Sequence, residues 1–237
     1  MAEDEIRHHF EQTYRSHSLD TYAQKFFDAT KCDATEDFIG WIASTSPNNN
    51  FCDFGCGEGK AISELMINLP DFNVSGVEKY PSHVFAENIH EGDFSHIPFP
   101  DDFFGSGVSN AALGSYAEDE LELHDHFKEL YRVLSPGAGI LLSPFNSLQK
   151  VVSDNGEIAN LAGIPISRLS DSEFCIQKPS MGNLGAPDTT NSFQCKLLKV
   201  ALDCGFEGRV MHAYIGGSFG RLPPEIYITG VELRVQK

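Results

Sequence analysis

The feature that most constrains this chain is the stretch FCDFGCGEGK, from Phe51 to Lys60. A short apolar approach ends in Asp53, and a helical pattern runs from Ala61 to Leu69 after the loop. Between them stand three glycines at two-residue spacing, Gly55, Gly57 and Gly59. Glycine has no Cβ, so such a loop can turn sharply and let a ligand approach the backbone closely. The pattern indicates a cofactor-binding loop between a strand and a helix.

Two common nucleotide loops fit this stretch poorly. A dinucleotide loop follows GxGxxG, but here the third glycine comes one residue early and Lys60 holds the last position. The phosphate-binding pattern GxxxxGK[ST] has a different spacing and needs Ser or Thr where this chain has Ala61. Asp53 would repel a pyrophosphate, whereas it suits a ligand that carries an ammonium group. The residues therefore favour an amino-acid-bearing nucleoside, with glycines that serve only packing as the alternative.

Four segments together resemble a known family. DFGCGEG resembles motif I of the class I S-adenosylmethionine-dependent methyltransferases, and VSGVEKY (74–80) resembles the second strand of that family. EGDFSHIPFPDDFFGSGVSNAALGSY (91–116) is similar to GDxxxLPFxDxxFDxVxS, and ELYRVLSPGAGILLS (129–143) is similar to the RVLKPGG helix, turn and fifth strand. The resemblance covers about residues 45–145 closely and is greatest to the ubiquinone-biosynthesis-like, or methyltransferase type 11, subgroup. Gly105 replaces the family's Asp in FDxVxS, a residue that is usually structural.

The resemblance implies that S-adenosyl-L-methionine is the cofactor. In the family the residue matching Glu78 binds both ribose hydroxyls, the one matching Asp93 accepts from the adenine amino group, and Phe94 would stand beside the ring. Ligands of an open parallel sheet lie beyond the carboxyl ends of its strands, so these positions should converge on one crevice. The predicted cofactor-binding residues are Asp53, Phe54, Gly55, Cys56, Gly57, Gly59, Glu78, Lys79, Asp93, Phe94, Ser109 and Asn110.

Strand and helix signals alternate along the chain, which predicts a parallel sheet covered on both faces. With the resemblance, this gives an α/β, Rossmann-like methyltransferase fold: a mostly parallel seven-stranded sheet with helices on both faces and an antiparallel last strand. One or two helices should precede the first strand. The expected strands lie near 50–54, 73–78, 89–92, 104–109, 139–143, 209–214 and 226–235, with a helix over 192–204.

We expect residues 1–237 to form a single domain with two additions. The first is an N-terminal helical cap over about 1–45. The second is an insertion over about 145–191, in which Gly, Pro, Ser and Asn accumulate. A long segment without strong periodicity in a compact domain is more often a functional lid than a plain connector. We therefore expect the insertion to act as a lid and to set the acceptor.

The composition of the chain limits which classes of partner the protein is expected to bind. The formal net charge of −17 disfavours nucleic acid, whose binding relies on clustered Lys and Arg. No apolar run approaches the roughly 18 residues of a membrane span, and the start of the chain is polar and acidic, so a cytoplasmic protein is expected. Six cysteines form no CxxC pair, and no metal site is expected. The sequence is compatible with a homodimer and does not decide the oligomeric state.

The expected chemistry is in-line displacement of the sulfonium methyl by an acceptor nucleophile, with catalysis from placing the reactants in line and excluding water. A small-molecule acceptor is the leading hypothesis. A protein methyltransferase, and a non-methylating cyclase or sensor on the same fold, remain alternatives. Nine histidines are present, and none identifies itself as the general base. The weak catalytic candidates, for which packing or turn capping is the structural alternative, are Tyr14, His17, Tyr22, Asn110 and Tyr116.

Overall fold

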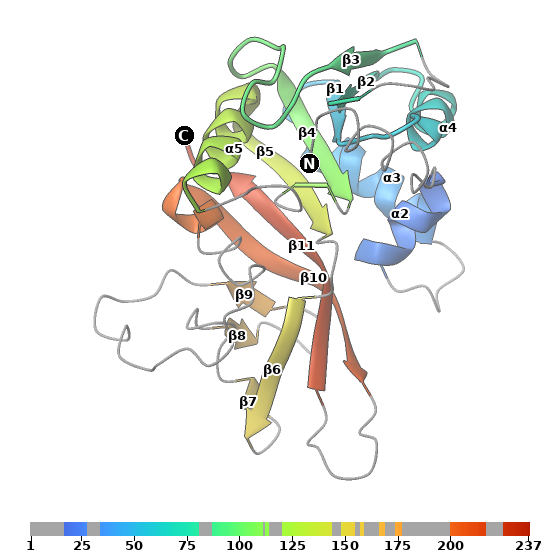
Figure 1. The fold of residues 1–237 in the computed structure, drawn as a ribbon. Coiled ribbons are helices and arrows are strands. Elements are labelled where there is room, and N and C mark those ends of the chain that lie inside the picture. The colour runs from blue at the N-terminus through green and yellow to red at the C-terminus, as the bar shows by residue number, and fades with distance from the viewer. Residues whose placement is uncertain are drawn as a thin grey trace.

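The computed structural model is organised around one large twisted sheet (Figure 1). The structure describes residues 17–27, 34–80, 87–110, 112–113, 120–143, 148–154, 157–158, 166–168, 174–176, 200–216 and 225–237. Of the sequence-predicted site residues, Tyr14 and Tyr116 lie outside these ranges.

The strand order in the sheet is β3-β2-β1-β4-β5-β11-β10-β9-β8. The pairs that link β3, β2, β1, β4 and β5 are parallel, whereas β11 is antiparallel to both β5 and β10. This confirms the predicted α/β fold, in which seven central strands pair mostly in parallel and the last strand of the chain is antiparallel. The central strands are β1 (Asn50–Phe54), β2 (Asn73–Glu78), β3 (Ile89–Glu91), β4 (Phe104–Asn110), β5 (Leu134–Ser143), β10 (Phe206–Gly216) and β11 (Glu225–Val235).

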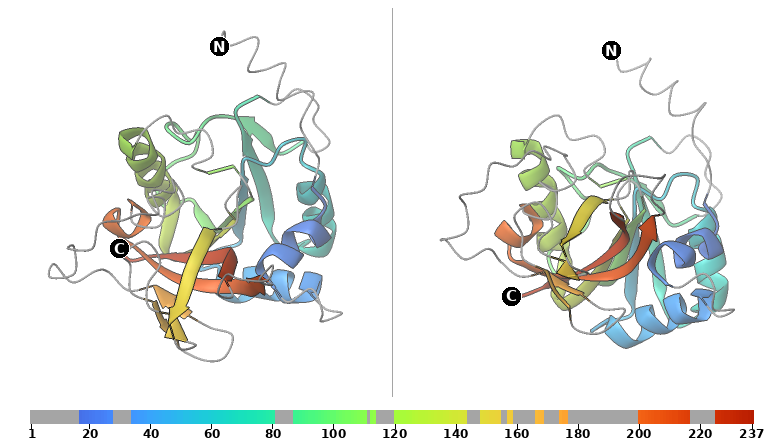
Figure 2. Two further views of the ribbon diagram at one scale, coloured as in Figure 1. Left: turned by 60° about the horizontal axis from the view of Figure 1, so that its bottom comes forward. Right: turned by 90° about the horizontal axis from the view of Figure 1, so that it is seen from below.

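Helices cover both faces of the sheet (Figure 2). On one face α2 (Leu19–Phe26), α3 (Ala34–Thr45) and α4 (Lys60–Asn68) pack on Phe51 and Val108. On the other, α5 (Glu120–Val133) and the helical residues 200–203 pack on Cys52 and Phe54. Because side chains alternate between faces along a strand, Asp53 points to the side of α2, as Phe51 does.

The N-terminal cap begins its described part at His17. Ser18 caps α2 by accepting a hydrogen bond from the Thr21 amide at 3.3 Å, and the buried side chains of α2 recur at helical spacing. These buried residues are Leu19, Tyr22, Ala23 and Phe26. The helix α3 ends just before Ser46 and Pro47, where the sequence predicted a break.

The segment expected to be an irregular insertion adds strands to the sheet. Its described residues form β6 (Leu148–Asp154), β7 (Glu157–Ile158), β8 (Ile166–Arg168) and β9 (Phe174–Ile176). β9 pairs with β10, and β6 pairs with the part of β11 that extends beyond β5. Within the described ranges the sheet therefore has 11 strands, which corrects our expectation of an irregular segment. The reason is that β10 and β11, each of 11 residues, offer ladder positions that β5 does not fill.

No helix within the described ranges is long and apolar enough to cross a membrane.

Candidate functional site

The glycine loop begins directly after β1 and has the backbone that its sequence predicts. Gly55, Gly57 and Gly59 adopt φ values of 80°, 58° and 78°, in the left-handed region that glycine tolerates best. A Cβ on Gly55 would lie 2.2 Å from the Cβ of Ala112, so no side chain fits between the loop and the end of β4. Gly59 occupies the N-cap position of α4. The loop therefore brings bare backbone to the carboxyl end of the sheet.

Asp53 is the last but one residue of β1 and is completely buried. The Tyr22 hydroxyl donates a hydrogen bond to Asp53 Oδ2 at 2.8 Å, and Asp53 Oδ1 has no hydrogen-bond partner among the described residues. Burial raises the pKa of Asp53 to about 7, and the charge of Glu78 adds to the rise while the Tyr22 hydrogen bond opposes it. A buried carboxylate oxygen that lacks a donor is a site where a ligand donor can bind.

Glu78 is the last residue of β2 and supports the glycine loop. Its Oε2 accepts the amide of Gly57 at 2.9 Å, and its Oε1 accepts the amide of Tyr80 at 3.3 Å. Both loop glycines nearest β1 are thus tied to β2, because the Gly55 amide also donates to the carbonyl of Val77 at 2.8 Å. The contact explains why an acid follows the glycines by about twenty residues.

Asp93 lies in the turn after β3, next to the end of β2. Lys79 Nζ is 3.4 Å from Asp93 Oδ2. The amide of Ser95 donates to Asp93 Oδ1 at 2.9 Å. Burial alone would raise the pKa of Asp93, but the Ser95 hydrogen bonds and Lys79 outweigh it and lower the pKa below its ordinary value. Asp93 is therefore ionised and is available as an acceptor.

Phe94 stands between the glycine loop and α5. Its ring is 3.6 Å from the position that a Cβ on Gly55 would take, and it packs on the His126 ring with 5.6 Å between the centroids. His126 is buried, its Nδ1 has no partner in the described part of the chain, and burial lowers its pKa. His126 comes from α5, and its contact with Phe94 was not predicted because the two residues are far apart in the chain.

Ser109 and Asn110 end β4 and differ in what they do. The Leu113 amide donates to Ser109 Oγ at 3.1 Å, which is the turn capping that we named as the alternative to a site role. The Asn110 side chain is buried, and neither Nδ2 nor Oδ1 has a partner among the described residues. Asp53 pairs with Val108 across the ladder, so Asn110 lies two residues further along the same face. Asp53 and Asn110 therefore present unpaired polar atoms on one side of the sheet.

The chain matches known methyltransferases. A family model described as Methyltransferase domain matches residues 52–142, the span from β1 to β5 that carries these residues. Over this span the chain therefore carries a methyltransferase domain. The match supports an enzyme that uses S-adenosylmethionine as its cofactor. No curated protein sequence matches the chain.

Solved structures share the fold of this methyltransferase at low sequence identity. SAM-bound CalS10, an amino pentose methyltransferase from Micromonospora echinaspora, aligns over 95% of each chain with a TM-score of 0.52 and 15% identity. A S-adenosylmethionine-dependent methyltransferase from Clostridium acetobutylicum aligns over 99% of each chain, with a TM-score of 0.51 and 12% identity. DesVI from Streptomyces venezuelae aligns over 100% of each chain, with a TM-score of 0.50 and 14% identity. These likenesses confirm the predicted Rossmann-like fold.

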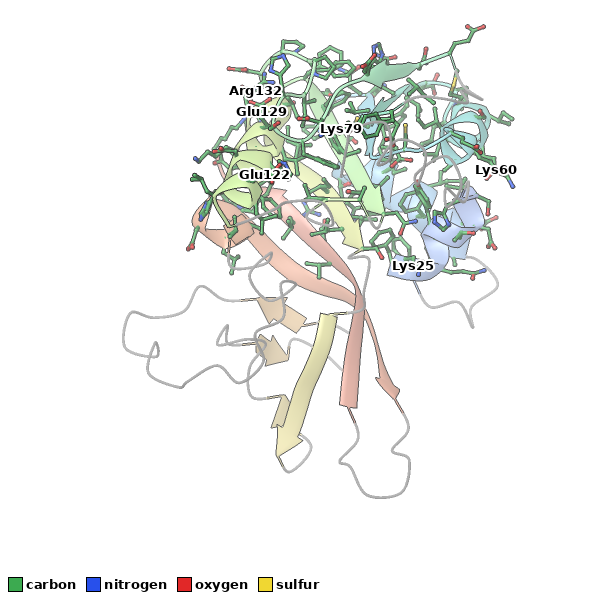
Figure 3. The ribbon with its side chains drawn as sticks, viewed as in Figure 1. Lys25, Lys60, Lys79, Glu122, Glu129 and Arg132 are labelled. Carbon is green, nitrogen blue, oxygen red and sulfur yellow. The ribbon has the colours of Figure 1, made fainter. Side chains whose placement is uncertain are left out.

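The methyltransferase domain fits its cofactor by its own chemistry. The methionine part of S-adenosylmethionine carries an ammonium group, and Asp53 Oδ1 is a buried carboxylate oxygen without a donor. The backbone of the loop carries no side chain at Gly57 and Gly59, just before α4, which suits a ligand that contacts backbone closely. Lys60, by contrast, is exposed on α4 and points outward (Figure 3), unlike a phosphate-binding lysine. The residues present therefore suit a cationic nucleoside better than a polyphosphate.

Several predicted residues take structural positions in the methyltransferase. The Phe54 side chain is buried on the α5 face and packs edge-on against Phe104, 5.6 Å between centroids, so only its backbone faces the loop. Cys56 packs on Gly76 of β2, where an added Cβ would lie 2.5 Å from the Cys56 sulfur. His17 packs beside Tyr22, with ring centroids 6.3 Å apart. Within the described ranges no group of three or more metal-ligating side chains comes together.

Proposed function

We propose that the enzyme transfers the sulfonium methyl of S-adenosylmethionine to a small-molecule acceptor by in-line displacement. The observation that carries the proposal is the pair of unsatisfied buried polar groups, Asp53 Oδ1 and the Asn110 amide, on one face beside the glycine loop. Buried polar atoms without partners are rare in native proteins, and binding sites are where they recur. When bound, the cofactor supplies an electrophilic methyl group.

The residues divide into those that would hold each part of the cofactor. Asp53 would hold the ammonium of the methionine part, and Glu78 would accept the ribose hydroxyls with the lone pairs its two amide donors leave over. Asp93 would accept from the adenine amino group, with Phe94 beside the ring. Asp93 suits this role because Lys79 and Ser95 already hold it ionised and oriented.

Asn110 would orient the acceptor. Its amide offers one donor group and one acceptor oxygen at the end of β4, where neither is used by the described protein. A group held there at a fixed position contributes to catalysis by placing the nucleophile in line, and a buried setting excludes water.

The helical cap and the 145–191 segment would enclose the acceptor. Figure 1 shows α2 on the side of the sheet to which Asp53 points, with α3 beside it. That CalS10 is an amino pentose methyltransferase supports a small acceptor as one that this fold can take. The formal net charge of −17 supports a neutral or cationic acceptor over nucleic acid, because like charge repels a polyanion.

The first experiment is calorimetric titration with S-adenosylmethionine, S-adenosylhomocysteine and NAD. We expect binding of the two sulfur nucleosides and none of NAD. Asp53→Ala and Glu78→Ala should each abolish donor binding, whereas Asp71→Ala, which changes an exposed carboxylate, serves as the matched control. Donor binding retained in both site variants would overturn the assignment of the site.

The acceptor is tested by transfer of labelled methyl in cell extract. Label in small metabolites supports the proposal. Label in a polypeptide band would replace it with protein methylation, and tight donor binding without any transfer would indicate a cyclase or a sensor.

A further inference from the structure

Tyr22 reaches the candidate site from an element that the glycine-loop motif does not include. It lies 31 positions before Asp53, on α2, and its side chain is 2% exposed. Two contacts fix the start of α2: Ser18 caps it, and the amide of Leu19 donates to Glu64 Oε2 of α4 at 2.6 Å. The Tyr22 hydroxyl is therefore held at Asp53 by a docked helix.

We propose that Tyr22 is a positioning residue of the cofactor site, whose hydroxyl holds Oδ2 of Asp53 so that Oδ1 is directed to the ammonium of S-adenosylmethionine. The inference rests on the proposed function, because it takes Asp53 as the ligand of that ammonium. The geometry supports it in one respect above all: of the two carboxylate oxygens, one has its donor at 2.8 Å and the other has none among the described residues.

The surroundings of Asp53 make this hydrogen bond matter. Among the described residues, the titratable groups that interact with the carboxylate are Tyr22 from α2, Cys56 of the glycine loop and Glu78 of β2, together with Cys52, its neighbour in β1 on the opposite face of the sheet. None of these carries a positive charge. Burial and Glu78 both raise the pKa of Asp53, and Tyr22 opposes them. Burial also raises the pKa of Cys52 and Cys56, so both thiols stay neutral at ordinary pH.

A dependence of cofactor affinity on pH follows. An ammonium binds an ionised carboxylate, so affinity should rise as the pH increases through about 7, the pKa of Asp53. The substitution Tyr22→Phe keeps the ring and its packing but removes the hydroxyl that donates to Asp53. The pKa of Asp53 should then rise further, and the same gain in affinity should require a higher pH.

The test is calorimetric titration of wild type and Tyr22→Phe with S-adenosylhomocysteine from about pH 5.5 to about 7.5, which stays below the α-amino pKa of about 7.7–8.0. The second ligand is 5′-methylthioadenosine, which keeps the nucleoside and lacks the ammonium. We expect Tyr22→Phe to bind S-adenosylhomocysteine roughly tenfold more weakly or worse, as for loss of a hydrogen bond to a charged group, with its pH profile displaced upward. Binding of 5′-methylthioadenosine should be unchanged and independent of pH in this range.

Two control variants assign the effect. Tyr131→Phe also removes one hydroxyl that makes a hydrogen bond, to the carbonyl of Gln236, and should leave both ligands unaffected. His17→Gln removes the imidazole next to Tyr22, which can titrate in the same range. If the pH dependence disappeared in His17→Gln, it would belong to that imidazole and the proposal would be wrong.

The remaining outcomes are also decisive. An unchanged pH profile in Tyr22→Phe, or an equal loss of both ligands, would show that Tyr22 only packs α2 and would overturn the inference while leaving the site intact. Failure of the wild type to bind S-adenosylhomocysteine would instead overturn the proposed function.

Discussion

Asp53 illustrates how one residue can serve a site at a cost to the fold. Its carboxyl has an ordinary pKa of 3.8 and a pKa of about 7 in the folded protein, because it is buried. A pKa that is raised on folding means that the folded state prefers the protonated form. The contribution of the protonated Asp53 to the free energy of unfolding is therefore complete below about pH 3.8, and it is lost as the pH rises through about 7. At pH values above the pKa of Asp53 in the folded protein, its ionised carboxylate lowers the free energy of unfolding by on the order of 4 kcal/mol.

We predict that Asp53→Asn stabilises the cofactor-free protein. The amide stays neutral, so the free energy of unfolding should rise by on the order of 4 kcal/mol near neutral to alkaline pH and by less in mild acid. Urea denaturation at the two pH values measures this, and S-adenosylhomocysteine should stabilise wild type but not the variant. An equal gain at both pH values would contradict an origin in ionisation.

Asn110 allows a second prediction at this scale. Its two amide atoms are buried without described partners, so Asn110→Leu, of similar shape, should raise the free energy of unfolding by about 1–2 kcal/mol while it lowers methyl transfer. Ser109→Ala is the matched control, because Ser109 Oγ accepts the Leu113 amide and its removal should destabilise by about 1 kcal/mol. Urea denaturation of both variants measures the two changes, a rise in the free energy of unfolding for Asn110→Leu and a fall for Ser109→Ala. A destabilised Asn110→Leu would mean that the amide has a structural role.

Among the elements, the contact between α5 and the loop after β3 is the one that bears on the adenine segment. Arg132 donates to the carbonyls of Ile97 and Phe99 at 3.0 and 2.9 Å, and Glu129 accepts the Ile97 amide at 3.1 Å. Figure 3 shows Arg132 and Glu129 together at the end of α5 that faces this loop. The turn that carries Asp93 and Phe94 is thus held from its far side.

We predict that Arg132→Lys weakens binding of S-adenosylhomocysteine several-fold. Lysine keeps the charge but lacks the planar fork that bonds both carbonyls, so the loop should lose part of its order. Calorimetry on this variant beside Lys128→Ala, an exposed residue of the same helix paired only with Asp125 in the described contacts, measures the effect. Equal affinity in the two variants would show that the loop does not depend on the clamp.

Regular elements with local signals were predictable from the sequence. The apolar run into Asp53 gave β1, and β2 was predicted with its observed bounds of 73–78. The four strands between Leu148 and Ile176 were not, because each is short and is formed by pairing with β10 or β11 or with one another, which local pattern does not report. The segment read as a loop because of its Gly, Pro, Ser and Asn content. Its role as a lid stays a prediction.

The positions of candidate site residues were predictable where a motif fixes a residue at a strand end, while their roles stay a prediction. Gly55, Glu78 and Asp93 lie where the spacing placed them, at the carboxyl ends of adjacent strands and in the turn that follows. The hydrogen bond from Tyr22 to Asp53 was not predictable from the sequence, since an aromatic residue at helical spacing usually packs in the core. It became visible only when α2 was placed on the face of β1 that Asp53 occupies.

Over the whole molecule, charge is unbalanced. The chain carries 34 acidic and 17 Lys or Arg side chains, so the folded surface repels itself. We predict that the melting temperature rises when salt increases from about 0.01 M to about 0.5 M, because the Debye length falls from about 30 Å to a few ångströms. Thermal melts at fixed pH measure this. Asp53→Asn should shift the whole curve without changing its slope, because salt screens a buried charge little; a flatter slope would place Asp53 among the exposed charges.

The glycine at 105, where the family has an aspartate, has a consequence for which substitutions this position can accept. A Cβ at Gly105 would lie 2.4 Å from the backbone oxygen of Asn48. The side-chain amide of Asn48 donates hydrogen bonds to the Phe103 carbonyl and to Ser135 Oγ, which hold this residue in place. The loop before β1 thus fills the space that a side chain at 105 would need. An aspartate at position 105 therefore requires the backbone around Asn48 to move, so that substitution depends on how far the loop before β1 can shift.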